Sequence, residues 1–214
     1  MTGVHLLVMA KEPVPGRVKT RLCPPCDPGQ AARLAEASLA DTLAAVQACG
    51  AGRRLLALDG RPGEWLPPGF TVFPQIGSSF PERLARAWQR AGGPGVQIGM
   101  DTPQVTAALL DAALGRLDTG GRHALLGPAR DGGWWALGLS VPDADVFRGV
   151  PMSTPATGAR QRGRLVERGY RVAELETLRD VDVIEDALAV ADAAPGTRFA
   201  RAVRHLQLAS GVRV

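Results

Sequence analysis

The chain has 214 residues, and its 45% hydrophobic content is enough to bury the core of one α/β domain spanning residues 1–214. The net charge of +4 comes from scattered arginines without interleaved aromatic residues, so no nucleic-acid partner is expected. No apolar run is long enough to span a bilayer, and no basic region precedes the short apolar start; we expect a cytoplasmic protein without a membrane span.

The first predicted element is a buried parallel strand that begins at Val4 and ends in a cationic loop. The chain has only two lysines, and both lie in this loop. The residues that single out the loop are Lys11, Gly16, Arg17, Lys19 and Arg21. Ligands bind beyond the carboxyl ends of strands in open α/β sheets, so this position favours a site for phosphate.

The composition of the loop suits phosphate as well. Lysine acts on phosphate oxygens as a point charge and arginine as a planar fork, while Gly16 allows the backbone to approach a ligand closely. The loop is not a P-loop, which would need glycines in place of Pro13 and Val18. The alternative is a solvated basic surface loop.

Two cysteines follow the loop with the spacing of a redox or zinc half-site, Cys23 and Cys26. The sequence has neither a second pair nor a histidine in ligand spacing. Together with Cys49 they are interpreted as ordinary thiols rather than as a metal or disulfide site.

The next elements alternate between helix and strand. Hydrophobic periodicity predicts helices over residues 28–48 and 79–91, and strands over residues 53–58 and 70–73. Ser79 is expected to cap the second of these helices, with Glu82 completing a capping box. After the strand over residues 70–73, Gln75 could bind a nucleobase edge. Arg83, in the helix that follows, could face phosphate. A capped helix after a polar turn explains both residues equally well.

Asp101 is the strongest single candidate for metal binding. It follows a predicted strand over residues 96–100 and precedes a predicted helix over residues 103–117, which would hold its carboxylate at the ligand edge of the sheet. Mg²⁺ prefers hard oxygen ligands, typically one or two carboxylates with phosphates and water. The alternative role of helix cap is assigned to Thr102 instead.

A glycine-rich turn joins two predicted strands over residues 123–126 and 134–139. Its two adjacent glycines, Gly132 and Gly133, would permit close approach of a substrate, and the tryptophans that follow would supply flat walls. Asp131 would bind an acceptor or act as its base. A hairpin turn with core tryptophans is the competing interpretation.

The last part of the chain carries a second carboxylate pair. A helix over residues 156–168, a strand over residues 170–175, and helices from Val183 and Thr197 are predicted. Asp180 and Asp182 would share one face of an extended segment, so they could reach the same cation, or Asp182 could cap the next helix. Alternating strands and helices predict a mainly parallel sheet covered on both faces.

Four motifs resemble one bacterial family with a domain of unknown function that is regarded as glycosyltransferase-like. They are MAKEPVPGRVKTRL, GMDTP, GPARDGGWWALGL and DVDVIEDAL, and they span nearly the whole chain in order. The resemblance implies a glycosyltransferase-A-like, nucleotide-diphospho-sugar transferase fold, related to that of cofactor nucleotidyltransferases. It also implies that Asp101 binds metal, with Asp182 as second ligand and Asp180 as its substitute.

Together these features predict a Mg²⁺-dependent (or Mn²⁺-dependent) transferase that uses a nucleotide-sugar donor and a small-molecule acceptor. Catalysis would rest on positioning and charge neutralisation. The expected catalytic residues are Asp101, Asp131 and Lys19, and the expected nucleotide-binding residues are Lys11, Gly16, Arg17, Lys19, Arg21, Gln75 and Arg83. The alternatives are a nucleotidyltransferase that releases pyrophosphate and a nucleotide-binding regulatory module without turnover.

Overall fold

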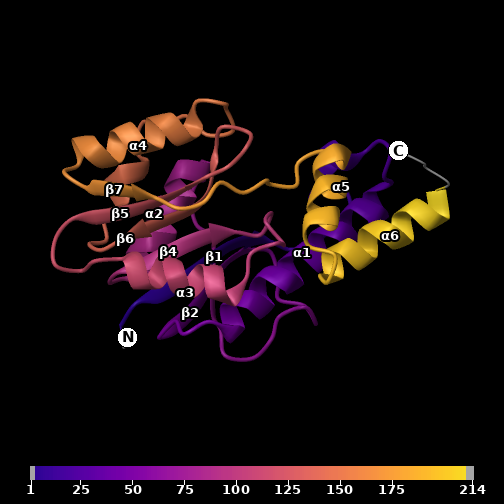
Figure 1. Cartoon of the computed structure of the whole chain (residues 1–214), viewed down its shortest axis with the longest axis horizontal. Helices are drawn as coiled ribbons and strands as arrows, with labels where there is room; N and C mark the ends of the chain where they lie inside the picture. Colours follow the sequence, from indigo (N-terminus) through magenta and orange to yellow (C-terminus); the bar gives the residue numbers. More distant parts are fainter. Residues whose placement is uncertain (1–2, 211–214) are drawn as a thin grey trace.

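A seven-stranded sheet forms the centre of the computed structural model, which describes residues 3–210 (Figure 1). The strand order is β3-β2-β1-β4-β6-β5-β7, and all neighbours are parallel except β6, which is antiparallel to β4 and β5. The strands are β1 His5–Lys11, β2 Arg53–Asp59, β3 Thr71–Pro74, β4 Gly95–Gly99, β5 His123–Pro128, β6 Trp134–Leu139 and β7 Arg171–Glu174. The mainly parallel α/β sheet is therefore confirmed.

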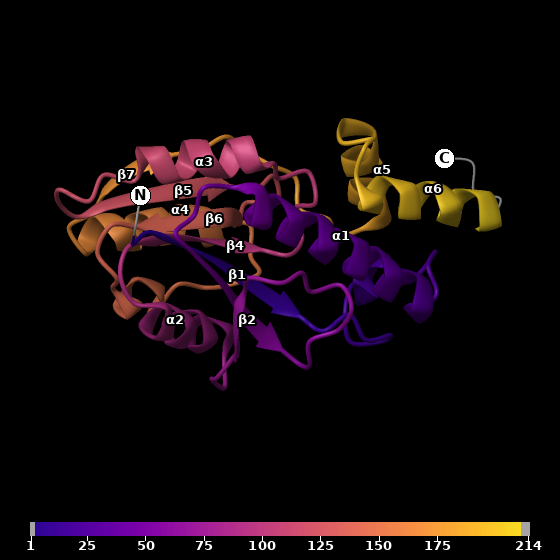
Figure 2. The same ribbon diagram turned by 90° about the horizontal axis from the view of Figure 1, so that it is seen from below.

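Helices cover both faces of this sheet, as Figure 2 shows. The first face packs against α1 and α3, and the second against α2, α4 and η2. The helices are η1 Thr20–Leu22, α1 Pro28–Ala48, α2 Phe80–Ala91, α3 Ala107–Arg116, η2 Ala144–Phe147, α4 Thr157–Glu167, α5 Ile184–Ala193 and α6 Arg198–Ser210. None of those among residues 3–210 is long and apolar enough to cross a membrane.

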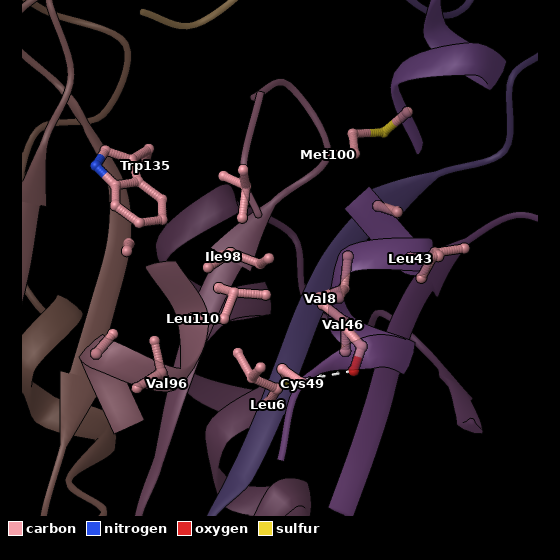
Figure 3. Packing of buried hydrophobic residues seen from close by; sticks show 14 of the residues in the cluster. Leu6, Val8, Leu43, Val46, Cys49, Val96, Ile98, Met100, Leu110 and Trp135 are labelled. Carbon is pink, nitrogen blue, oxygen red and sulfur yellow. Dashed lines mark hydrogen bonds between the residues drawn. The ribbon is translucent and has the colours of Figure 1, made fainter. Parts of the chain in front are cut away.

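Strand periodicity explains how one sequence serves both faces. Side chains alternate along a strand, so Leu6 and Val8 of β1 enter the cluster under α1, whereas Leu7 and Met9 enter the cluster under α2. The first cluster is shown in Figure 3, where Leu43 of α1 lies among the labelled strand residues.

The last two helices pack away from the sheet. In Figure 1, α5 and α6 lie together beside one end of α1, and the connection after β7 runs along the sheet to reach them. Their buried residues form a third cluster with Leu22 of η1 and Leu34 of α1. The end of the cationic loop is thereby anchored to the C-terminal helices.

Most predicted boundaries agree with the structure, but the start of α3 was placed wrongly. The helix begins at Ala107 because Thr106 Oγ1 accepts a hydrogen bond from Leu109 N (3.2 Å). The preceding residues form a turn in which Val105 N donates to Thr102 O (3.1 Å). Thr102 is therefore not a helix cap, and its hydroxyl has no hydrogen-bond partner within residues 3–210.

Two further capping predictions were wrong in their partners. Ser79 does cap α2, but Glu82 Oε2 accepts hydrogen bonds from the backbone and hydroxyl of Ser78 (both 2.9 Å) rather than from Ser79. Asp182 does not cap α5: the N-cap is Val183, and Asp186 Oδ2 accepts from both backbone N–H groups (3.2 Å each). The side chain of Asp182 is left available for another partner.

Candidate functional site

The segment between β7 and α5 crosses the carboxyl ends of two strands and assembles the site there. Arg130 N, just beyond β5, donates to Leu178 O (3.0 Å), and Val181 N donates to Asp101 O (3.0 Å), just beyond β4. Val181 is fully buried. Asp180 is thus held beside the loops that follow β4 and β5.

Lys19 supplies the positive charge at this position. Its ammonium nitrogen lies 2.5 Å from Asp101 Oδ1 and also donates to the carbonyl oxygen of Val181. The side chain is only 9% exposed, and its backbone is left-handed, with φ 49°. An L-residue rarely adopts this conformation, and such strained backbones cluster at functional sites. The ammonium has three N–H groups, so one remains free for a ligand.

Asp180 lies in a region of excess negative charge. Burial, reinforced by the carboxylates of Asp101, Asp131 and Asp182, raises the pKa of Asp180 to about 7, against the smaller opposing effect of Lys19. Its Oδ1 atom is buried without a hydrogen-bond partner within residues 3–210. The site therefore has more carboxylates than its single lysine can neutralise, which favours binding of a further cation.

Asp182, by contrast, is engaged by the cationic loop. Its Oδ2 atom accepts a hydrogen bond from Arg21 Nη1 at 3.1 Å, and both side chains are substantially exposed. Of Asp180 and Asp182, it is Asp180 that has a buried oxygen, Oδ1, without a partner in the described part of the chain. We expected Asp101 and Asp182 to share one cation. In this structure the Asp182 carboxylate is bound by Arg21 instead.

The remaining residues of the cationic loop border an open hollow of about 170 Å³. It is lined by Lys11, Glu12, Arg17, Val18 and Asp59. Gly16 has φ +76°, and a Cβ added there would face open space, so this glycine serves the turn geometry. Lys11 and Arg17 are both exposed and available to an anionic ligand.

The two residues predicted after β3 lie beside the same strand ends. The amide nitrogen of Gln75 donates to Ala10 O (2.8 Å) and Ala57 O (3.1 Å). Arg83 Nη1 binds Asp59 Oδ2 at 3.2 Å. Arg83 is therefore neutralised by a carboxylate rather than being a free phosphate-binding cation.

The glycine-rich turn between β5 and β6 packs against α4 rather than standing open to a substrate. Gly158 N donates to Gly132 O (2.8 Å), and a Cβ at Gly132 would collide with the carbonyl oxygen of Pro155. Asp131 is exposed, and its Oδ1 accepts from Gly133 N (2.8 Å), whereas its other oxygen has no partner among residues 3–210.

The two tryptophans point to opposite faces of the sheet, so they do not form paired walls. Trp135 is 2% exposed and donates its indole N–H to Glu176 O (2.9 Å) within the first core cluster. Trp134 is partly buried against the second cluster together with Met152. The prediction of a wall formed by both rings was wrong for Trp135, because alternation along β6 sends it into the core.

The structure adds residues that the sequence reasoning did not select. Asp59 ends β2 and Glu12 follows Lys11, and both line the hollow. Their positions at strand ends were the available signal. Cys23, Cys26 and Cys49 are free thiols, and burial raises the pKa of Cys26 and of Cys49.

Comparison with known proteins places the chain in a family and a fold. The profile of a family described as uncharacterized proteins conserved in bacteria (DUF2064) matches residues 31–154. No curated protein matches the chain. A solved structure from Desulfovibrio desulfuricans G20, described provisionally as a nucleotide-diphospho-sugar transferase, has a TM-score of 0.86 at 24% identity, covering 98% of this chain and 97% of that chain.

Two nucleotidyltransferases are similar at a greater distance. A nucleotidyl transferase from Methanothermobacter thermautotrophicus has a TM-score of 0.58 at 19% identity and covers 92% of this chain and 98% of that chain. The 2-C-methyl-D-erythritol 4-phosphate cytidylyltransferase from Thermus thermophilus has a TM-score of 0.54 at 17% identity, with coverages of 91% and 100%. These similarities show a shared fold.

Proposed function

Because the chain belongs to the DUF2064 family and has the fold of nucleotide-diphospho-sugar transferases, we propose that it is a Mg²⁺-dependent transferase that uses a nucleotide-sugar donor. The observation that carries the proposal is the contact of Lys19 with Asp101 beside Asp180, whose Oδ1 atom is buried without a hydrogen-bond partner within residues 3–210. Group transfer from a nucleotide needs cations for phosphate and carboxylates for metal, and this site offers both.

The carboxylates fit a divalent metal. Asp180 Oδ1 lacks a partner within residues 3–210, and its raised pKa reports uncompensated negative charge around it. No three histidine, cysteine, aspartate or glutamate residues among those described are grouped to form a complete metal site. A Mg²⁺ or Mn²⁺ ion commonly takes one or two carboxylates and completes its shell with phosphate oxygens and water. Asp101 and Asp180 would hold it.

When bound, the metal would neutralise charge on the leaving phosphate. Lys19 would place its third N–H on a phosphate oxygen while Asp101 and Val181 keep its ammonium fixed. Lys11 and Arg17 would bind the remaining phosphate oxygens, together with those N–H groups of the exposed Arg21 side chain that its pair with Asp182 does not use. Asp131, with one oxygen held by Gly133 N, would use the other to orient the acceptor hydroxyl and take its proton.

Nucleotidyl transfer is the second candidate. It is favoured by the similarity in fold to the two nucleotidyltransferases. The same arrangement could serve attack at an α-phosphorus, which releases pyrophosphate, or at a sugar carbon, which releases a nucleoside diphosphate.

The leaving group distinguishes these reactions. The protein would be incubated with Mg²⁺, small-molecule extracts as acceptors, and a panel of nucleotide-sugars and nucleoside triphosphates, and the products identified by mass spectrometry. We expect a nucleoside diphosphate from one nucleotide-sugar. Pyrophosphate from a triphosphate, with no nucleotide-sugar consumed, would establish nucleotidyl transfer instead. Tight nucleotide binding without any turnover would identify a regulatory module.

A further inference from the structure

Three neighbouring strand ends place hydrogen-bond acceptors along one part of the sheet edge, and two of these residues, Glu12 and Asp59, line the hollow. Glu12 follows β1, Asp59 ends β2 and Gln75 follows β3. Backbone hydrogen bonds hold them in adjacent positions, since Glu12 N donates to Asp59 O (2.9 Å) and Gln75 N donates to Leu58 O (3.0 Å). This part of the sheet edge is distinct from the part near β4 and β5 that carries Asp101 and Asp180.

The two carboxylates are each fixed through one oxygen. Glu12 Oε2 accepts from Arg61 N (2.8 Å), and Asp59 Oδ2 accepts from Arg83 Nη1 (3.2 Å). Each therefore keeps its second oxygen for a ligand. An ionised carboxylate can only accept hydrogen bonds.

Gln75 is restricted to the same role. Its side-chain amide contacts the carbonyl oxygens of Ala10 and Ala57, which only accept hydrogen bonds. The NH₂ group must therefore face these carbonyls, and the free atom of the amide is its oxygen. The edge thus offers three acceptors and suits a ligand with several donors.

The size and surroundings of the hollow suit a nucleobase. The hollow is open to solvent, and its volume of about 170 Å³ is large enough to receive one ring system. Lys11 and Arg17 line the same hollow. A base seated there would therefore leave its phosphates at the cationic loop.

We infer that the nucleotide is a guanine nucleotide, an inference that rests on the nucleotide-dependent function proposed above. Guanine presents two neighbouring donors on one edge, the N1–H and the N2 amino group. Adenine and cytosine each present one amino donor on that edge, and uracil presents one N–H. Paired carboxylates at Glu12 and Asp59 match the guanine edge, because the N1–H and the N2 amino group can then each meet an acceptor.

Binding of nucleoside diphosphates tests this without choosing the reaction. Affinities of GDP, IDP, ADP, CDP and UDP would be measured by calorimetry with Mg²⁺. We expect GDP to bind about tenfold more tightly than ADP, CDP and UDP, the scale of one well-matched base contact. IDP lacks only the N2 amino group of GDP, and it should lose most of that advantage.

Variants test which residues distinguish guanine from other bases. Asp59→Asn and Glu12→Gln should each reduce the preference for GDP over IDP, whereas Glu36→Gln, an exposed carboxylate on α1, should not. Thermal melts would verify folding of Asp59→Asn, which loses the pair with Arg83. If UDP or ADP binds as tightly as GDP, the guanine inference is overturned, while the proposed function still stands. Failure of every diphosphate to bind would overturn both.

Discussion

Lys19 and Asp101 form a close ion pair, 2.5 Å between Nζ and Oδ1, that joins the loop after β1 to the loop after β4. The lysine is almost fully covered, whereas the carboxylate is 43% exposed. A fixed cation thus lies behind a carboxylate that still faces solvent. This arrangement offers a ligand both a metal-binding oxygen and a positive charge from adjacent residues.

Replacing Lys19 should weaken nucleotide binding. Lys19→Ala removes a charge-assisted hydrogen bond, so we expect a loss of at least ~1 kcal/mol in binding free energy. Calorimetry with a nucleoside diphosphate measures this, and Lys11→Ala should show a similar loss from its exposed position. Arg33→Ala, on the exposed side of α1, is the control. Unchanged affinity in a folded Lys19→Ala variant would show that the loop is only surface.

Metal dependence should be lost with Asp101. Mg²⁺ or Mn²⁺ is expected to strengthen nucleotide binding to the natural protein, and chelation should reverse this. In Asp101→Asn the affinity should no longer respond to the metal, because the amide is a weaker ligand for a hard cation. Asp182→Asn should keep the response, since Arg21 already holds that side chain. If both variants lose the response to metal, Asp182 is a metal ligand as well as Asp101.

Asp180→Asn should stabilise the metal-free protein at high pH. Burial and neighbouring carboxylates raise the pKa of Asp180 from 3.8 to about 7. Because the folded state holds the proton more tightly, stability is lost as the pH rises from about 4 through 7. Asparagine cannot ionise, so the variant should gain about 2–4 kcal/mol at pH 8. The gain should shrink toward pH 4 in denaturation curves. A constant difference across this range would contradict the assignment.

His5 should make the protein sensitive to acid. It is fully buried beside Trp88, and both ring nitrogens lack partners within residues 3–210. Burial, with a smaller effect of Arg53, lowers the pKa of His5 to about 4. The unfolded chain therefore binds the extra proton first, and stability falls as the pH drops from 6.5 to 4, by about 3 kcal/mol.

The slope of stability against pH isolates this contribution. His5→Phe should flatten the slope between pH 4 and 6.5, whatever its effect on stability at neutral pH. His205→Gln, at an exposed position on α6, should leave the slope unchanged. An equally steep slope in the His5 variant would assign acid sensitivity to other groups.

Gly132 should not tolerate a side chain. Its φ of +87° is unfavourable for alanine, and the added Cβ would collide with the Pro155 carbonyl. We expect Gly132→Ala to cost at least about 2 kcal/mol of unfolding free energy. Gly115→Ala on α3, where nothing lies within 4 Å of the new Cβ, should instead be neutral or stabilising. Chemical denaturation of both variants measures the contrast.

Local pattern predicted most of the fold but not the pairing of charges. Periodicity gave α1 and β6 their observed bounds, since long or alternating apolar segments depend on short-range geometry. The start of α3 was missed because two threonines could act as caps, and only packing selects Thr106 over Thr102. Likewise, the path of the segment after β7 turns Asp182 toward Arg21 and Asp180 inward. The spacing of the two residues in the sequence does not determine that path.

The hydrogen bond from Lys19 to the carbonyl of Val181 joins the loop after β1 to the segment before α5. The matched family region, residues 31–154, lies between them and contains neither residue. Leu22 and Val181 pack in the third cluster with α5 and α6, so partial unfolding that detaches these helices would loosen the attachment of the lysine to Val181. The chemistry of the site would then be sensitive to the integrity of a helical pair whose described side chains do not enter it, and hydrogen exchange at Val181 N would report the loss of both.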